Sequence, residues 1–160
     1  MSDDYKIVVA QGGFDPIHRG QIEYLKEARK LGDRLVVALA SDNALIQKKK
    51  HYLLGWEDRH SVISNLSAVN EVIYIDDYYN SQQIVLDQLR KRYPNSTIVF
   101  AFGGAQTESN TLQIKDHDVV AEYNVGGNER QNNSSNILRA FAEYVRSVSN
   151  YEAGPNGRYT

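Results

Sequence analysis

Residues 8–33 read VVAQGGFDPIHRGQIEYLKEARKLGD and join an apolar run to a helical pattern through a pair of glycines. The apolar run ends at Ala10 and contains valine, a β-branched residue that favours strands. From Gln21 to Lys30 the apolar residues recur at the spacing of one helix face. The stretch therefore predicts a strand, a tight turn and a helix in direct succession.

Four more apolar runs follow along the chain, and helical patterns separate most of them. The runs are Leu35–Ala40, Val72–Ile75, Ile98–Phe102 and Val119–Ala121, and the longer helical patterns are Trp56–Leu66, Ser81–Arg92 and Ser134–Val148. Short continuous apolar runs are typical of strands that are buried on both faces of a parallel sheet. The order predicts an α/β fold, namely a Rossmann-like, open doubly wound sheet of about five parallel strands with helices on both faces.

Three local features refine this prediction. The pattern that begins at Trp56 is expected to place Val62 and Ile63 on one buried face. The segment QKKKHYLLG, residues 47–55, is interpreted as a loop. Two serines at positions 134 and 135 open the last helix, and serine is a favoured N-cap residue.

Length and composition bound the class of protein. The 160 residues favour one domain, which we expect to span residues 1–150, followed by a polar tail over residues 151–160. The net charge of −2 argues against a general nucleic-acid binder, and the chain has no cysteine for disulfides or thiolate metal sites. The acidic start lacks the pattern of a signal peptide, and no window approaches the ~18 apolar residues of a membrane span. We therefore expect a soluble, cytoplasmic protein without a nucleic-acid or membrane partner.

The first strand-to-helix turn is where a ligand is expected, because doubly wound sheets bind ligands beyond the carboxyl ends of their strands. Gly12 and Gly13 allow close approach, and His18 and Gln21 share one helix face with Gly20 between them. The start of the helix adds free N–H groups and the positive end of a dipole. The turn has neither a G-x-G-x-x-G fingerprint nor a P-loop lysine, so its chemistry indicates another kind of phosphate site.

The segment GGFDPIHRGQ, residues 12–21, resembles the signature of the nucleotidyltransferases that carry an H-x-G-H motif, the cytidylyl- and adenylyltransferases. EARKLGDRLVVALASD, WEDR and NNSSNILRAF are similar to later segments of the glycerol-3-phosphate cytidylyltransferases and related sugar-phosphate enzymes, in the same order. In that family a substrate phosphate attacks a nucleoside triphosphate and pyrophosphate leaves. The resemblance implies transfer of a cytidylyl group from CTP to a small phosphorylated alcohol or sugar phosphate, Mg²⁺ bound with the triphosphate, and a homo-oligomer.

The resemblance also assigns roles to individual residues. His18, Gln21, Lys48 and Arg59 would be catalytic, and the remaining matched positions would bind the nucleotide. These binding positions are Gly12, Gly13, Phe14, Asp15, Gly20, Gly103, Gly104, Ser134 and Ser135. The resemblance assigns no residue to a metal.

Several positions depart from the family pattern. Gln21 stands where the family has its second histidine, and glutamine can donate a hydrogen bond but cannot carry charge or move a proton. Phe102 is bulky and apolar, and Ala105 follows Gly104 where a polar or acidic residue is usual. Three hypotheses therefore stay open: a cytidylyltransferase, an adenylyltransferase that uses ATP, and a non-catalytic nucleotide-binding or assembly protein with the same fold.

Each site residue also has a simpler interpretation. Arg59 could pair with Glu57 or Asp58, Asp15 could order the turn by accepting backbone N–H groups, and the lysine run could be a solvated loop. His18 and the two serines could act only as helix caps. The tyrosine-rich segment YIDDYYN, residues 74–80, could form a partner surface or a solvated loop.

Overall fold

The computed structural model describes residues 5–104, 112–127 and 133–148, and these form a parallel five-stranded sheet in the order β3-β2-β1-β4-β5. The strands are β1 (Lys6–Gly12), β2 (Arg34–Ala40), β3 (Glu71–Ile75), β4 (Thr97–Gly103) and β5 (Val119–Val125). The helices are α1 (Arg19–Arg29), α2 (Asp42–Lys49), α3 (Trp56–Ser64), α4 (Ser81–Arg92) and α6 (Ser134–Ser147). The chain order reverses at β1, which lies between β2 and β4.

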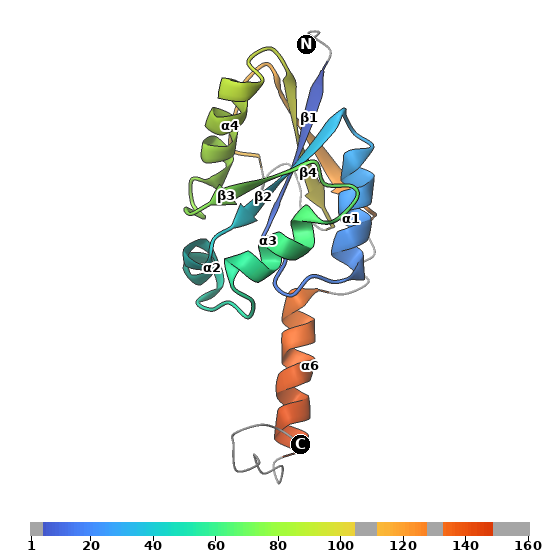
Figure 1. Ribbon diagram of the computed structural model, residues 1–160, viewed down its shortest axis with the longest axis vertical. Coiled ribbons are helices and arrows are strands. Elements are labelled where there is room, and N and C mark those ends of the chain that lie inside the picture. Colours follow the sequence, from blue (N-terminus) through green and yellow to red (C-terminus); the bar gives the residue numbers. More distant parts are fainter. Residues whose placement is uncertain (1–4, 105–111, 128–132, 149–160) are drawn as a thin grey trace.

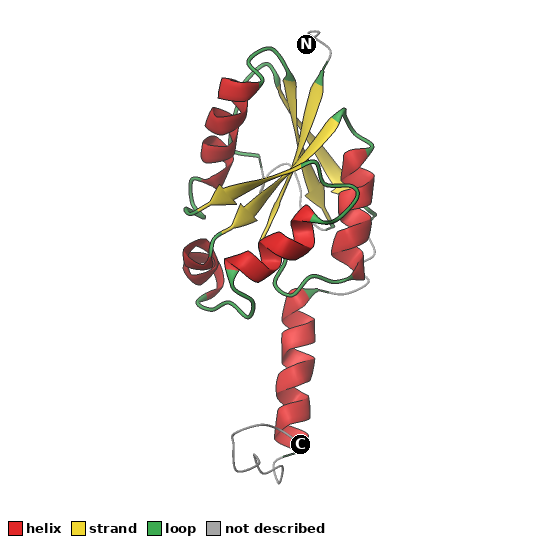
Figure 2. Cartoon of the chain, in the orientation of Figure 1, coloured by secondary structure: helices red, strands yellow, loops and turns green. Residues whose placement is uncertain are grey.

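Helices cover both faces of the sheet, which confirms the predicted doubly wound fold (Figure 1). α4 packs on one face, and α1 and α3 pack on the other (Figure 2). α6 extends away from the sheet as a separate arm (Figure 1). No helix within the described ranges is long and apolar enough to cross a membrane.

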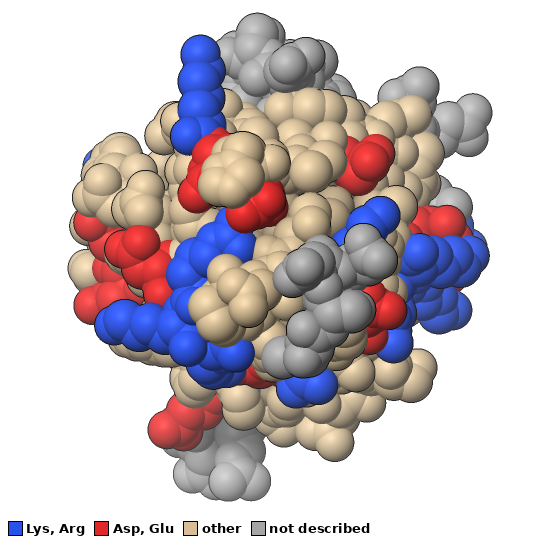
Figure 3. All heavy atoms as spheres, turned by 90° about the horizontal axis from the view of Figure 1, so that it is seen from above, with Lys and Arg blue, Asp and Glu red and all other residues tan. Residues whose placement is uncertain are grey.

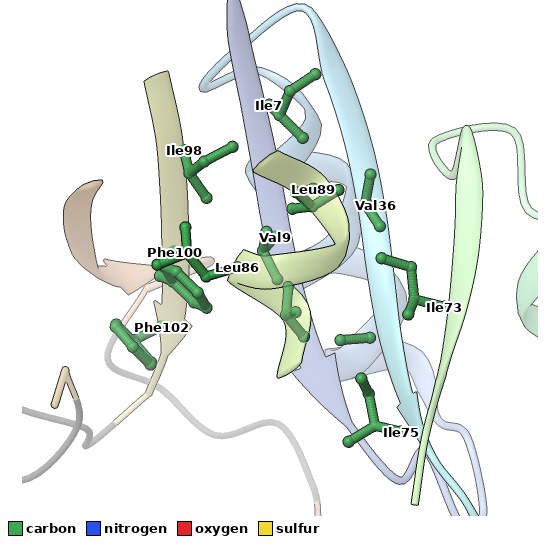
Figure 4. Packing of buried hydrophobic residues seen from close by; sticks show 12 residues of the cluster. Ile7, Val9, Val36, Ile73, Ile75, Leu86, Leu89, Ile98, Phe100 and Phe102 are labelled. Carbon is green, nitrogen blue, oxygen red and sulfur yellow. The ribbon is translucent and has the colours of Figure 1, made fainter. Parts of the chain in front are cut away.

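The face beneath α4 is filled by alternate residues of the central strands. Ile7 and Val9 of β1 lie between Val36 of β2 and Phe100 of β4, with Leu89 of α4 packed over them (Figure 4). Alternation follows from the period of a strand, in which successive side chains point to opposite faces. The odd-numbered residues of β1 therefore face α4, and the position that follows Val9 in this series is Gln11.

The opposite face is filled by Val8 and Ala10 of β1 together with Leu25 of α1 and Ile63 of α3. The prediction that Val62 shares the buried face of α3 is wrong, since this side chain is 41% exposed while Ile63 is fully buried. α3 ends at Ser64, and its buried residues are Arg59 and Ile63. These two lie one helical turn apart and therefore share a face. An arginine thus takes a core position that the apolar pattern alone cannot indicate.

Two predicted boundaries shift in the structure. α2 continues to Lys49, so Lys48 lies in the last helical turn and not in a loop. The N-cap of α6 is Asn133, whose side chain accepts a hydrogen bond from the Asn136 N–H at 2.7 Å, and the serines follow it inside the helix. Asparagine caps a helix as well as serine does, so Asn133, which comes first in the sequence, can be the N-cap in place of Ser134.

The end of the molecule from which β1 starts carries both signs of charge. Lys and Arg side chains lie beside Asp and Glu side chains on this face (Figure 3). Glu71 of β3 forms ion pairs with Arg34 and Arg92, and the first of these joins Arg34 Nε and Glu71 Oε2 at 3.7 Å. This end of the sheet is therefore a surface of mixed charge, while the carboxyl ends of the strands hold the predicted site.

Candidate functional site

The glycine turn after β1 is fixed from two sides. A Cβ atom on Gly13 would lie 2.5 Å from Leu45 Cδ2, so no larger residue fits there unless the Leu45 side chain moves. Phe14 adopts a left-handed backbone with φ of +51° and is nevertheless buried, since its ring packs close to Gly12. The turn is thereby held close to the end of β1, where the backbone is open to a ligand.

Arg59 anchors this turn from beneath. Its buried guanidinium donates to the carbonyl oxygens of Gly13 (3.1 Å), Ala40 (2.6 Å) and Leu54 (2.8 Å), and it pairs with Asp42 Oδ1 at 2.8 Å. These bonds join the ends of β1 and β2 to the start of α2. The pairing with Glu57 or Asp58 that the sequence leaves open does not appear among these contacts. The structure therefore shows Arg59 as an internal tie, and its predicted contact with phosphate stays a prediction.

Asp15 acts in a similar way. Its two carboxylate oxygens accept hydrogen bonds from the backbone N–H groups of Leu53 (2.6 Å) and Leu54 (2.8 Å). The side chain is buried, so both oxygens are used within the protein. Asp15 orders backbone N–H groups, as the simpler interpretation of the sequence expects, but these belong to residues 38 and 39 positions further along the chain.

The beginnings of α1 and α6 meet at one junction, which consists of Pro16, His18, Gln21 and Ser134. The Gln21 side chain accepts a hydrogen bond from the His18 backbone N–H (3.2 Å) and donates to Ser134 Oγ (3.4 Å). The buried Ser134 hydroxyl donates in turn to the Pro16 carbonyl oxygen at 2.8 Å. The first N–H groups of a helix have no acceptor within it, so two helix starts at one place favour an anion.

His18 is the N-cap of α1 and is half-buried at this junction. Its Nδ1 atom is buried and has no hydrogen-bond partner within the described residues. Burial lowers the pKa of the imidazole from its ordinary value, so the ring is neutral near pH 7. A neutral imidazole still carries one N–H donor. Gly20 lies in the first turn of α1, and Ser135 is exposed in the first turn of α6.

A cavity of about 440 Å³ opens over the α4 face at the carboxyl ends of β1, β2 and β4. Gly12, Gly13 and Lys48 are the predicted site residues that line it, whereas His18 does not. Gln11 adds a side-chain Nε2 atom that is buried and has no partner in the part of the chain that the structure describes. The glycine turn therefore connects two features, the cavity on one side and the junction on the other.

The remaining predicted positions lie beside these features. Gly103 ends β4, and a Cβ atom there would lie 3.1 Å from the ring of Tyr24, whose hydroxyl donates to the Ala101 carbonyl oxygen at 2.5 Å. Gly104 follows with φ of +62°. Phe102 is buried and stacks on Tyr123 with ring centroids 5.2 Å apart. Ala105, which departs from the family pattern after Gly104, lies outside the described residues.

Sequence reasoning missed some residues of the cavity. Gln11, Tyr78 and Asn80 line it, and the last two belong to the segment YIDDYYN between β3 and α4. The position of this segment, directly after a strand of a parallel sheet, is the signal that could have found it, because ligands bind at that edge.

One surface cluster lies on the segment before β5. His117 Nδ1 is 3.0 Å from Asp116 Oδ1, and His117 Nε2 is 2.9 Å from Asp118 Oδ2. The three side chains could together hold a metal ion, although exposed acidic groups of this kind are common without one. The cluster is therefore kept apart from the site at the glycine turn.

An open parallel sheet with helix starts and a glycine turn at its carboxyl edge defines a nucleotide-binding α/β protein. The cytidylyltransferase-like family matches residues 9–150, and the chain belongs to this family of nucleotidyltransferases. This match agrees with the resemblance that residues 12–21 indicate.

Individual relatives match over shorter ranges. The chain is 35% identical over 82 residues to glycerol-3-phosphate cytidylyltransferase from Bacillus subtilis (strain 168), which covers 51% of this chain and 64% of the relative. It is 45% identical over 74 residues to the bifunctional protein HldE from Hahella chejuensis (strain KCTC 2396), which covers 45% of this chain and 16% of HldE. The chain thus spans less than two thirds of these curated relatives.

The fold also occurs in a solved structure. The crystal structure of the lipopolysaccharide core biosynthesis protein from Thermoplasma volcanium GSS1 superposes with a TM-score of 0.54 at 23% identity. The match covers 73% of this chain and 94% of that protein. At this identity the likeness concerns the fold alone.

Proposed function

We propose that the protein transfers a nucleotidyl group, with CTP as donor, to a small phosphorylated alcohol or sugar phosphate. The observation that carries this proposal is the junction of α1 and α6, where two helix starts and His18 meet beside a cavity with one lysine. The junction suits the triphosphate, because helix starts favour anions. The cavity suits the acceptor, because Lys48 is the one charged residue among those that line it in the described ranges.

In this reaction an oxygen of the acceptor phosphate attacks the α-phosphorus of the triphosphate. A new P–O bond forms there, the bond to the β-phosphate bridge breaks, and pyrophosphate leaves with the electron pair. The protein contributes chiefly position and charge, as nucleotidyl and phosphoryl transfer require. His18 donates its one N–H to an α-phosphate oxygen and stabilises the charge that develops there. Ser135 and the first N–H groups of α6 hold the outer phosphates.

Mg²⁺ fits this arrangement as a companion of the triphosphate. No carboxylate lines the cavity within the described ranges, and both Asp15 oxygens are engaged with backbone N–H groups. The ion would therefore be held by phosphate oxygens and water, since Mg²⁺ keeps several waters when it binds with substrate phosphates. It would neutralise charge on the triphosphate.

The test is release of pyrophosphate from CTP or ATP with Mg²⁺ and a panel of phosphorylated acceptors. His18→Ala is expected to lower the rate about 10²- to 10³-fold, the usual cost of a lost transition-state donor. Release with ATP alone would assign the protein to the adenylyltransferases. Absence of release above the His18→Ala level with every donor and acceptor would refute the proposal.

A second candidate is a non-catalytic nucleotide-binding protein, and the contacts of Gln21 favour it. The oxygen of this side chain accepts from the His18 N–H and its Nε2 group donates to Ser134, so the protein holds the amide at both ends. Gln21→His restores the family residue and discriminates the two candidates. A large gain in pyrophosphate release would identify a weakened enzyme, and nucleotide binding by calorimetry without any gain would identify a binding protein.

A further inference from the structure

The cavity on the α4 face holds a cation that lacks an acidic partner. Its lining in the described part of the chain contains phenol, amide and apolar side chains, and Lys48 is its one charged member. Burial and the neighbouring Lys49 both lower the pKa of the Lys48 ammonium. Lys48 as a whole is exposed, so its ammonium is accessible, and a cation without an acidic partner favours an anionic ligand.

Tyr78 contacts this ammonium. The Lys48 Nζ atom lies over the Tyr78 ring at 5.3 Å from its centroid, which is within the range of a cation–π interaction. The rings of Tyr78 and Tyr79 form a T-shaped pair with their centroids 5.4 Å apart. Tyr78 therefore limits the directions in which the flexible lysine chain can point.

The loop that carries Tyr78 is held against α2, the helix that carries Lys48. The Tyr78 N–H donates to Gln47 Oε1 at 2.9 Å, and Asn43 Nδ2 donates to the Asp76 carbonyl oxygen at 3.3 Å. Ser41, the N-cap of α2, donates through its hydroxyl to Asp76 Oδ1 at 2.6 Å. The loop is thus fixed to α2 by bonds at both ends of the helix, which brings the Tyr78 ring close to Lys48.

The loop is also ordered from within. Asp77 accepts hydrogen bonds from the Tyr79 N–H at 2.9 Å and from Asn80 Nδ2 at 2.7 Å. These bonds, which lower the pKa of the Asp77 carboxyl, fix the turn that leads into α4. The tyrosine loop is therefore an ordered wall of the cavity, although Tyr78 and Tyr79 are also 39% and 68% exposed to solvent.

We propose that Tyr78 is a positioning residue that holds the Lys48 ammonium inside the cavity, ready to receive the phosphate of the acceptor. This inference rests on the proposed function for the identity of the acceptor, but the positioning itself can be measured without any reaction. It makes the loop 76–80 part of the binding pocket.

The first measurement is the NMR spectrum of the Lys48 side chain in the full chain. An aromatic ring beneath the ammonium shifts the neighbouring methylene protons upfield. We expect this shift in the unaltered protein and in Tyr78→Phe, which keeps the ring, and its loss in Tyr78→Leu. Ordinary chemical shifts of Lys48 in the unaltered protein would overturn the proposal.

The second measurement is a titration with inorganic phosphate, followed at the backbone amide of residue 48. Tyr78→Leu is expected to weaken binding about 3- to 10-fold, the size of a cation–π contact, and Tyr78→Phe to stay within about twofold. Tyr52→Leu is the matched control, because Tyr52 is 43% exposed against 39% for Tyr78 and does not line the cavity. Lys48→Met should abolish the response, and Lys30→Met should not.

Equal phosphate affinity in Tyr78→Leu and the unaltered protein would refute the positioning role. Should Tyr78→Leu not fold, as judged by circular dichroism, Tyr78→Gln and the spectrum of the unaltered protein decide the same question. Phosphate binding that depends on Lys48 and Tyr78, without release of pyrophosphate from any nucleotide, would refute the proposed reaction and leave this inference standing.

Discussion

Arg59 and Lys48 are two cations that the family resemblance treats alike, and the structure places them in opposite surroundings. Arg59 is buried and donates to three carbonyl oxygens and one carboxylate. Lys48 points to a cavity, where its described contact is the face of an aromatic ring. A cation that makes four hydrogen bonds within the protein stabilises the fold, whereas one without an acidic partner is available for a ligand.

The same contrast separates the two halves of the glycine turn. The side chains that hold the turn, Arg59 and Asp15, have their polar atoms engaged in short hydrogen bonds. The groups at its ligand side, Gln11 Nε2 and His18 Nδ1, are buried and have no partner in the described residues. Buried polar atoms are rarely left without a hydrogen bond, so such atoms deserve a functional explanation. Gln11 and His18 are therefore the residues beside the turn with a buried polar atom left for a ligand, although buried atoms elsewhere, such as Trp56 Nε1, also have no partner in the described residues.

The largest expected effect is on the free energy of unfolding when Arg59 is replaced. Arg59→Met leaves three carbonyl oxygens and Asp42 without their donor, and should lower the free energy of unfolding by about 3 kcal/mol. Lys48→Met removes the same charge from an open site and should change it by less than about 0.5 kcal/mol. Urea unfolding followed by fluorescence measures both. Equal losses in the two variants would contradict the distinction between a tie and a ligand-facing cation.

A smaller effect is expected at Gly13. Gly13→Ala places a methyl group against Leu45 Cδ2, where the distance to the added atom is 2.5 Å, and overpacking of this kind costs about 1–3 kcal/mol. Adding Leu45→Val should recover part of the loss, because it withdraws the contacting methyl group. Gly55→Ala is the control, since its added atom would meet nothing closer than Asp42 Oδ2 at 4.0 Å. Thermal unfolding of the four proteins would sharpen the comparison, and a harmless Gly13→Ala would contradict it.

The smallest effect concerns pH and His18. Its pKa is lower in the folded protein than the ordinary 6.5, so the unfolded chain binds more protons between the two values. The stability that His18 contributes is therefore complete above pH 6.5 and is lost as the pH falls through the folded-state pKa. His18→Asn should flatten the fall of stability below pH 6.5, as measured by urea unfolding at several pH values. An unchanged profile would show that His18 is not desolvated at the junction.

The sequence predicted the sheet well because its strands are continuous apolar runs. Runs such as Leu35–Ala40 can only be buried on both sides, which requires a parallel sheet covered by helices. The end of α2 was harder to predict, because the polar residues there carry no periodic signal. The C-cap of the helix is Lys50, which has a left-handed backbone with φ of +70°. The exposed apolar residues of α6, among them Phe141 at 60% exposure, also show that helical spacing does not by itself prove burial.

The site was predicted in part for a related reason. Motif residues near one another in sequence, such as His18 and Gln21, are brought together by a single helix start. The bond between Gln21 and Ser134 joins residues 113 positions apart, and only the resemblance suggested that they meet. Tyr78 was missed because its role depends on the distance to Lys48 across two elements, and local patterns carry no such distance.

The hydrogen bond from Ser134 to the Pro16 carbonyl oxygen connects the start of α6 to the turn that precedes His18. The helix projects outward from the sheet (Figure 1), and the Ser134 hydroxyl at its inner end donates to the backbone two residues before His18. A change in the orientation of α6 would therefore have to alter the hydrogen bond that Ser134 makes to the turn before His18.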